Sequence, residues 1–370
     1  MIDVKLKLQP GHTGDLDWMA PSPLWQLFWN VTDACNFNCA ICFSNAGRAA
    51  QDELSSEEAE NMIRDAHAAG VTDIVVSGGE PFQRPDLVRL LTTMAKLGVT
   101  ARIATNGSLL TEDLLRRLRE ETLTKSFQIS LDTLDPALYE KIHGAPRGAL
   151  DAALEALRWI RKLGFHTTVS TRLSPRTLSG IPALLDRAVE EGWATVTIHC
   201  PLHTGRMDGA WPQDADVFSL LEEVFEHFLT LPQRWLVETC VPWAPFHPVM
   251  ERLSKRIRVA HAGCAAGRFR LAISASGWIS PCICMDLPAA PMGNVRTHSL
   301  ADVFRNSPVA QLMRCPQDHG ICADCAHVAR CGGGCRAAAY ALTGRLDGVD
   351  GSCPVQIARS DQKARAYANR

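Results

Sequence analysis

The chain has 370 residues, a formal charge of −2, 46% apolar residues and 14 cysteines. A chain of this length can bury a large core and is expected to form about two domains. Its average apolar fraction excludes a disordered or fibrous protein. Its near-neutral charge provides no basic surface for nucleic acid or for an anionic membrane.

Six apolar runs of strand length alternate with amphipathic stretches in the first half of the chain. The runs are 26–31, 73–77, 100–105, 126–131, 165–171 and 195–199. Ser55 with Glu58 forms a capping-box pattern before one amphipathic stretch, and Asp135 before Pro136 marks another helix start. Six strand–helix units predict an α/β fold, a partial (β/α)6 TIM-like barrel with its chemistry at the carboxyl ends of the strands.

The cysteines are unevenly distributed. No apolar run approaches the ~18 residues of a membrane span, and the N-terminus lacks a signal-peptide pattern. We therefore expect a cytoplasmic protein, whose thiols do not pair as disulfides. Three cysteines lie near the N-terminus, Cys200 and Cys240 are isolated, and nine lie between Cys264 and Cys353. This distribution indicates two metal-binding regions.

Directly after the first run, Cys35, Cys39 and Cys42 form a CxxxCxxC motif. Three thiolates within eight residues can hold one face of a four-iron cluster and leave one iron open, whereas a zinc site needs a fourth ligand close by. The alternative is that each cysteine is a small buried apolar residue, which is reasonable for any one of them.

With this motif after the first strand, the chain resembles the radical S-adenosylmethionine (radical SAM) superfamily. The resemblance implies that the amino and carboxylate groups of S-adenosylmethionine (SAM) chelate the open iron. Segments 78–80, 104–107 and 128–132 resemble the GGE, TNG and SLD motifs of the family. The residues that these motifs imply for SAM binding are Gly78, Gly79, Glu80, Asn106, Ser130 and Asp132.

Two positions depart from the family pattern. Ile41 stands where an aromatic residue often precedes the third cysteine, so packing on adenine can come from Phe43 instead. His143 stands where many members have an arginine, which leaves the partner of the SAM carboxylate open. Arg172, at the end of the fifth run, is a candidate, and the alternative is that it is a surface arginine.

The C-terminal cysteines resemble the seven-cysteine SPASM domain, a small domain that binds auxiliary iron–sulfur clusters. All seven occur in order: Cys264, Cys282, Cys322, Cys325, Cys331, Cys335 and Cys353. A zinc ribbon made from four of them would leave three unexplained. The resemblance implies one 4Fe-4S cluster (auxiliary I) held by Cys264, Cys282 and Cys335, and another (auxiliary II) held by Cys322, Cys325, Cys331 and Cys353.

Auxiliary I is one ligand short in this assignment. Cys284 is a candidate, because residues two apart on a strand point the same way. Cys315 is a second candidate, and an open iron that binds substrate is the third option.

The resemblance divides the chain into an N-terminal extension (1–24), a radical SAM partial barrel (25–205), a helical linker (206–262) and a SPASM domain (263–370). It implies an enzyme that reductively cleaves SAM to a 5'-deoxyadenosyl radical, which abstracts a substrate hydrogen. His199 and His203 are candidates for acid–base help. An electron donor of the flavodoxin or ferredoxin type is expected.

The substrate is the open question. The C-terminal segments resemble peptide maturases of the mycofactocin and pyrroloquinoline quinone type, which predicts oxidative modification of a ribosomal peptide, such as a crosslink or decarboxylation, in cofactor or natural-product biosynthesis. The alternative is a small molecule, either a sugar or aminoglycoside or a haem side chain. About 24 residues before the first strand are too few for a fused leader-peptide-binding domain of about 80. A peptide substrate is therefore expected to need a separate recognition protein.

Overall fold

The computed structural model describes residues 2–4, 22–199, 205–206, 223–224, 226–227, 230–231, 236–239, 257–259, 264–285, 292–315, 322–331, 333–348, 350 and 353. Three residues named above, Cys200, His203 and Cys240, lie outside these ranges.

Six parallel strands form the centre of the fold, in the runs that the sequence predicts. They are β2 (Gln26–Asn30), β3 (Asp73–Ser77), β4 (Thr100–Thr105), β5 (Thr124–Ser130), β6 (His166–Arg172) and β7 (Thr195–His199). Each strand pairs in parallel with the next along the chain. This sequential parallel order confirms the partial barrel.

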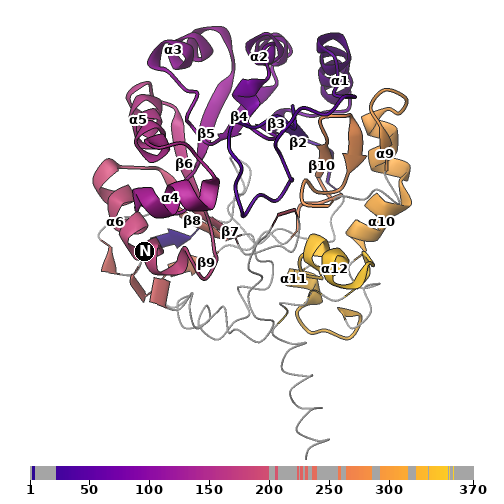
Figure 1. Ribbon diagram of the computed structural model, residues 1–370. Helices are drawn as coiled ribbons and strands as arrows, with labels where there is room; N and C mark the ends of the chain where they lie inside the picture. The colour runs from indigo at the N-terminus through magenta and orange to yellow at the C-terminus, as the bar shows by residue number, and fades with distance from the viewer. Residues whose placement is uncertain are drawn as a thin grey trace, which may run out of the picture.

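Helices connect the strands and form an arc around the outside of the sheet (Figure 1). They are α1 (Ser56–Ala68), α2 (Leu87–Lys96), α3 (Glu112–Glu121), α4 (Pro136–His143), α5 (Ala149–Lys162) and α6 (Ile181–Glu191), with short 3-10 turns at Pro81–Gln83 and Leu178–Gly180. Ser55 caps α1 in the expected capping box: its hydroxyl accepts from the Glu58 N–H, and the Glu58 carboxylate accepts from the Ser55 N–H. Asp135 likewise caps α4 by accepting from the Leu138 N–H at 2.9 Å.

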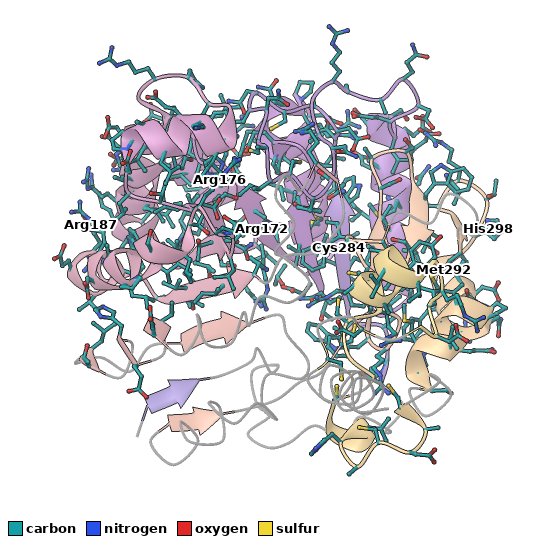
Figure 2. All side chains as sticks on the ribbon, turned by 60° about the horizontal axis from the view of Figure 1, so that its bottom comes forward. Arg172, Arg176, Arg187, Cys284, Met292 and His298 are labelled. Atoms are coloured by element: carbon teal, nitrogen blue, oxygen red, sulfur yellow. The ribbon has the colours of Figure 1, made fainter. Side chains whose placement is uncertain are left out.

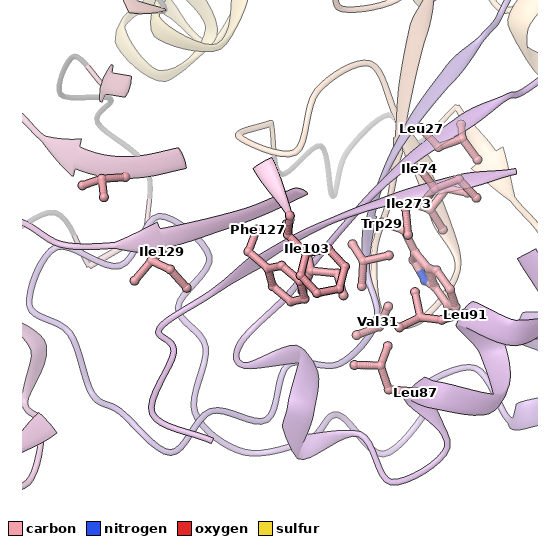
Figure 3. Packing of buried hydrophobic residues seen from close by; sticks show 14 of the residues in the cluster. Leu27, Trp29, Val31, Ile74, Leu87, Leu91, Ile103, Phe127, Ile129 and Ile273 are labelled. Carbon is pink, nitrogen blue, oxygen red and sulfur yellow. The ribbon is translucent and has the colours of Figure 1, made fainter. Parts of the chain in front are cut away.

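The core lies between this sheet and the helices. Leu27 and Trp29 of β2 are fully buried and pack in one cluster with Ile74, Ile103 and Phe127 from the next three strands (Figure 3). Fully burying an apolar side chain of this size contributes about 1.5–3 kcal/mol. The core therefore holds the strands rigidly and fixes the loops that follow their carboxyl ends.

The sheet continues beyond six strands at both edges. β8 (Leu236–Thr239) pairs in parallel with β7, and β10 (Arg270–Ile273) pairs in parallel with β2. β11 (Trp278–Ser280) and β12 (Gly293–Asn294) follow β10 as antiparallel strands. β1 (Ile2–Val4) and β9 (Ile257–Val259) form a separate parallel pair.

The prediction that 206–262 is a helical linker is wrong at β8 and β9, which are strands. The edge of β7 explains β8, because the backbone of residues 236–239 pairs with groups that the edge would otherwise leave open.

The C-terminal cysteine-rich region is fastened to the barrel. Its helices are α9 (Leu300–Asn306), α10 (Pro308–Arg314), α11 (Val328–Cys331) and α12 (Arg336–Thr343). α9 lies beside α1 (Figure 1), and the Leu300 N–H donates to Asp65 of α1 at 2.8 Å. Arg296 donates to Glu58, also on α1, at 2.6 Å. With β10 in the barrel sheet, these contacts hold the two cysteine regions in a fixed relation.

Candidate functional site

The loop that carries Cys35, Cys39 and Cys42, hereafter the cluster loop (residues 31–47), follows the carboxyl end of β2. Its backbone is bonded to the end of α4: the Asn38 N–H donates to the His143 carbonyl at 3.1 Å, and the Ala40 N–H donates to the Ile142 carbonyl at 2.8 Å. Cys35 N–H donates to the Gly47 carbonyl at 2.9 Å. Backbone hydrogen bonds to α4 and within the loop therefore fix the conformation of the cluster loop.

Two glycines from other loops pack directly on the cluster loop. A Cβ atom on Gly79 would lie 2.1 Å from the Ala34 carbonyl oxygen, and one on Gly205 would lie 2.2 Å from the Cys42 carbonyl oxygen. Both positions exclude any side chain. The lack of side chains at Gly78 and Gly79 thus lets the cluster loop pack closely against them. The motif predicts that it also lets a ligand approach.

Arg206 also holds the cluster loop. Its main-chain N–H donates to the Cys42 carbonyl at 2.8 Å, its Nε to the Cys39 carbonyl at 3.1 Å and its Nη1 to the Ala46 carbonyl at 2.8 Å. The sequence does not single out Arg206, because a single arginine after a glycine carries no local pattern that would set it apart.

The three thiols lie close enough to affect one another. Burial, together with the neighbouring Cys42 and Cys35, raises the pKa of Cys39 to about 12, and burial also raises the pKa of Cys35. Three thiolates are thus unfavourable here without a cation to bind them. The donor set fits an iron–sulfur cluster, which binds cysteine as thiolate.

Glu80 is fully buried beside the cluster loop and bridges two strand ends. Its carboxylate accepts from the Thr105 hydroxyl at 2.7 Å, the Asn106 N–H at 2.8 Å and the Phe82 N–H at 3.2 Å. Burial raises the pKa of Glu80 to about 7 even though these donors act in the opposite direction. A carboxylate has about four acceptor positions, so one remains for an ammonium group.

The Asn106 side chain points to the cluster loop. Its amide donates to the Asn36 Oδ1 at 2.9 Å, and its Oδ1 accepts from the Ser108 hydroxyl at 2.6 Å. Ser130 ends β5 and is half-buried. Asn36 therefore joins the site through the motif residue Asn106, a contact that the sequence did not predict.

Asp132, His143 and Cys39 form a continuous array. The Asp132 Oδ2 lies 3.2 Å from the His143 Nε2, and the His143 Nδ1 lies 3.4 Å from the Cys39 Sγ. The Asp132 Oδ1 accepts from the Arg172 main-chain N–H at 2.5 Å. Burial acts to raise the pKa of Asp132, but the hydrogen bonds from His143 and Arg172 outweigh burial and lower this pKa below its ordinary value. His143, noted as a departure from the family pattern, thus lies against the cysteine motif.

Arg172 and His199 end neighbouring strands and are register partners in β6 and β7. The Arg172 guanidinium carbon lies 5.7 Å from the centre of the Phe43 ring, so the two residues proposed from sequence to contact SAM come together. Burial, helped by the charge of Arg172, lowers the pKa of His199 to about 4, which makes His199 a neutral imidazole. Figure 2 shows Arg172 and Cys284 toward the middle of the view.

The cysteines of the C-terminal region separate into two groups. In the first, Cys264 and Cys282 act on the thiol of Cys335, and burial, with Asp350 and these thiols, raises its pKa well above the ordinary value. Cys284 belongs to this group, because its thiol forms a hydrogen bond with the thiol of Cys282 and both residues pack in one cluster with Cys335. Cys315 is absent from this packing cluster among the described residues.

The second group contains Cys322, Cys325, Cys331 and Cys353. Burial, Cys353 and Cys322 raise the pKa of Cys331 to about 12, and Cys353 and Cys325 act in the same sense on Cys322. Within the described residues, no three His, Cys, Asp or Glu side chains surround a position for a single metal ion. A four-iron cluster differs in binding each thiolate through a separate iron.

The two metal regions lie at opposite ends of strand β2. The cluster loop follows its carboxyl end, whereas Gln26 at its amino end is the register partner of Arg270. Cys264 and Cys282 lie close to Arg270, since both act on the pKa of its guanidinium, which burial lowers. Five residues of strand span about 16 Å. The two regions are therefore separated by about the length of this strand.

Comparison with known families agrees with this architecture. Residues 29–205 match the radical SAM superfamily, and residues 264–326 match SPASM, an iron–sulfur cluster-binding domain. The chain belongs to the radical SAM superfamily and carries a SPASM domain. It is a radical SAM enzyme, and its cofactors are SAM, the 4Fe-4S cluster that binds SAM, and auxiliary iron–sulfur clusters.

Two kinds of relative are similar over nearly the whole chain. Mycofactocin maturase MftC of Mycobacterium ulcerans is 30% identical over 335 residues, 88% of this chain and 87% of the relative. AdoMet-dependent heme synthase of Methanosarcina barkeri is 27% identical over 329 residues, 85% of this chain and 92% of the relative.

Among solved structures, SuiB of Streptococcus suis bound to the precursor peptide SuiA has a TM-score of 0.71 at 20% identity and covers 90% of this chain and 75% of that one. This likeness extends the agreement in fold through the C-terminal region. Within the described residues, no helix has the length and apolarity of a membrane span.

Proposed function

We propose that this enzyme oxidatively modifies a ribosomal peptide, forming a crosslink or removing a carboxyl group, in cofactor or natural-product biosynthesis. The observation that carries the proposal is the 30% identity to mycofactocin maturase MftC over 88% of the chain. It is accompanied by a second cysteine-rich region that can accept an electron from an oxidised substrate.

The proposed ligands of the SAM-binding cluster are Cys35, Cys39 and Cys42. The bound cluster and SAM supply a 5'-deoxyadenosyl radical that removes a substrate hydrogen atom. The protein holds the three thiols in one loop through Gly79, Gly205 and Arg206, and three thiol ligands leave one iron for SAM.

The SAM pocket in this proposal lies at the ends of β3 to β6. Glu80 offers its remaining acceptor position to an N–H of the methionine amino group, and Gly78 and Gly79 set the path of the backbone there. Arg172 provides a cation for the carboxylate, and Phe43 beneath it provides a face for adenine. Ser130 lies at the strand end for a ribose contact, while Asn106 and Asp132 position the cluster loop and His143.

The proposed auxiliary I ligands are Cys264, Cys282, Cys335 and, as the fourth, Cys284. The contact between the Cys282 and Cys284 thiols supports Cys284 over Cys315 and over an open iron. The proposed auxiliary II ligands are Cys322, Cys325, Cys331 and Cys353. Because the two metal regions lie at opposite ends of β2, a substrate between them can lose a hydrogen atom at one end and an electron toward the other.

His199 ends β7 as the register partner of Arg172 and, as a neutral base, is the proposed acceptor of the substrate proton. The proposed domains are the barrel (25–205) and the SPASM domain (263–370), joined by the segment 206–262. A separate peptide-recognition protein and an electron donor of flavodoxin or ferredoxin type are the proposed partners, and a cytoplasmic location is proposed with them.

A second candidate function is modification of a haem side chain. The specific observation in its favour is the 27% identity to AdoMet-dependent heme synthase over 92% of that relative. Arg172 would then contact a propionate in place of the SAM carboxylate.

The two candidates are separated by offering both substrates to the anaerobically reconstituted enzyme with dithionite and SAM. One reaction contains a ribosomal precursor peptide with a peptide-recognition protein, and the other contains an iron porphyrin with propionate side chains. The proposal predicts 5'-deoxyadenosine formation that depends on the peptide. It also predicts a decrease in peptide mass that corresponds to the loss of hydrogen for a crosslink, or to the loss of carbon dioxide and hydrogen for an oxidative decarboxylation. Consumption of the porphyrin with an unchanged peptide would refute it.

A further inference from the structure

Arg336 is a fully buried cation beside the C-terminal cysteines. It follows Cys335 at the start of α12, and its side chain is 1% exposed. A charge buried to this degree is strongly unfavourable unless an opposite charge or several hydrogen bonds compensate it.

The side-chain hydrogen bonds of Arg336 reach main-chain carbonyls alone within the described residues. Nη1 donates to the Leu346 carbonyl at 3.0 Å and to the Gly348 carbonyl at 2.7 Å, and Nη2 donates to the Gly333 carbonyl. Nε is buried and has no partner within those residues. The guanidinium therefore organises the loop between Cys331 and Cys335, while its charge has no carboxylate partner there.

Thiols of both cysteine groups lie within reach of this charge. The main-chain N–H of Arg336 bonds to the Cys264 thiol, and burial raises the pKa of Cys264 while the Arg336 charge acts to lower it. The Gly333 carbonyl that accepts from Arg336 lies two residues after Cys331, in the loop that joins Cys331 to Cys335. Cys264 and Cys335 belong to the first group and Cys331 to the second, and the charge of Arg336 also acts on the thiol of Cys322.

Arg270 provides a contrast. Its guanidinium is near Cys264 and Cys282 of the first group, and it is near Asp73, which offers a carboxylate. Asp350 is buried near Arg336 but accepts from the Cys335 N–H at 2.8 Å and adds negative charge to both groups.

We propose that Arg336 is the shared counter-cation of the two auxiliary clusters, a positioning residue that holds the Cys331–Cys335 loop and places one positive charge between both ligand sets. This inference rests on the auxiliary ligands assigned under the proposed function. Four thiolates give a 4Fe-4S cluster a net negative charge, and reduction adds to it. A buried cation close to both clusters therefore favours the reduced state of each and raises both reduction potentials.

The test measures the reduction potentials of the auxiliary clusters by titration followed by EPR, in full-length protein whose Cys35, Cys39 and Cys42 are all replaced by Ala. This background removes the signal of the SAM-binding cluster. Iron and sulfide are counted in parallel. Into it are placed Arg336→Gln, Arg336→Lys and the control Arg345→Gln, which removes an exposed arginine paired with Asp347 in the same region.

The expected result is a shift of both auxiliary potentials to more negative values in Arg336→Gln, a smaller shift in Arg336→Lys, and none in Arg345→Gln. Unchanged potentials in Arg336→Gln with full iron content would overturn the inference. If Arg336→Gln loses iron, Arg336→Lys decides: retained clusters with near-native potentials support the charge, and equal iron loss in both variants assigns a purely structural role. If the background protein with Arg336 intact holds no auxiliary iron, the proposed function fails, and this inference falls with it.

Discussion

Replacing Glu80 by Gln tests how the protein holds the amino group of SAM. Glu80 is fully buried, and burial raises its pKa from the ordinary 4.5 to about 7 in the SAM-free protein. At ~1.36 kcal/mol for each unit of pKa, the folded protein favours the protonated carboxyl over the ionised one by about 3 kcal/mol more than the unfolded chain does. The amino group of SAM would remove this preference by donating an N–H to the ionised form.

Two pH dependences follow. The SAM-free fold binds the Glu80 proton more tightly than the unfolded chain, so the free energy of unfolding falls as pH rises from 4.5 to about 7. SAM binding requires loss of that proton below pH 7, so its affinity falls up to tenfold per pH unit on acidification and is constant above about pH 7.

The assay is a SAM titration of the cluster-containing protein at pH 6, 7 and 8, followed by calorimetry or by the EPR change of the reduced cluster. Wild-type protein is expected to bind about tenfold more weakly at pH 6 than at pH 8, because pH 6 lies one unit below the raised pKa of Glu80. Glu80→Gln is expected to bind at least tenfold more weakly at pH 8, because the ionised acceptor of the SAM amino group is lost, and to show no pH dependence. The exposed Glu57→Gln on α1 is the control and keeps the wild-type profile. A wild-type affinity that is equal at pH 6 and pH 8, or a Glu80→Gln variant with the wild-type profile, would refute the reasoning.

Three further substitutions test other contacts. Cys284→Ser is expected to lower auxiliary iron and to change the auxiliary EPR signal, whereas Cys315→Ser leaves both unchanged; the reverse pattern would contradict the assignment of Cys284. Gly79→Ala places a Cβ 2.1 Å from a cluster-loop carbonyl and is expected to abolish assembly of the SAM-binding cluster, while Gly47→Ala, with no atom within 4 Å of its Cβ, keeps it, as judged by iron content. Arg206→Gln removes two charged hydrogen bonds, each of about 1.5–3 kcal/mol, and is expected to lower SAM-cluster iron several-fold without changing auxiliary iron; full iron content would show that the loop holds its shape without Arg206.

Local signals in the sequence predict the elements that depend on local physics. The apolar runs of strand length locate β2 to β7, because the buried positions of these strands accept few residue types other than apolar ones. The capping residues Ser55 and Asp135 act on N–H groups three residues away, so their pattern is visible in the chain. The cysteine motif is visible for the same reason.

Features that depend on distant residues escape the sequence. β8 and β10 join the sheet because the barrel has open edges, which no local pattern announces. Arg206 contacts carbonyls more than 150 residues away in the chain, and Arg336 becomes buried only when its loop closes around it. The contact of Gly78 and Gly79 with the backbone of residues 32–34 likewise cannot be inferred from a short motif, and their assignment to SAM binding stays a prediction.

The central claim is that the cluster loop binds a four-iron cluster that cleaves SAM. Its most direct test is the release of 5'-deoxyadenosine by anaerobically reconstituted protein with dithionite and SAM, measured by liquid chromatography with mass spectrometry beside an iron and sulfide count. Wild-type protein is predicted to release 5'-deoxyadenosine, and Cys39→Ala is predicted to abolish the release while retaining auxiliary iron. Anaerobically purified protein that contains zinc without iron or sulfide, or release that persists in Cys39→Ala, would contradict the account.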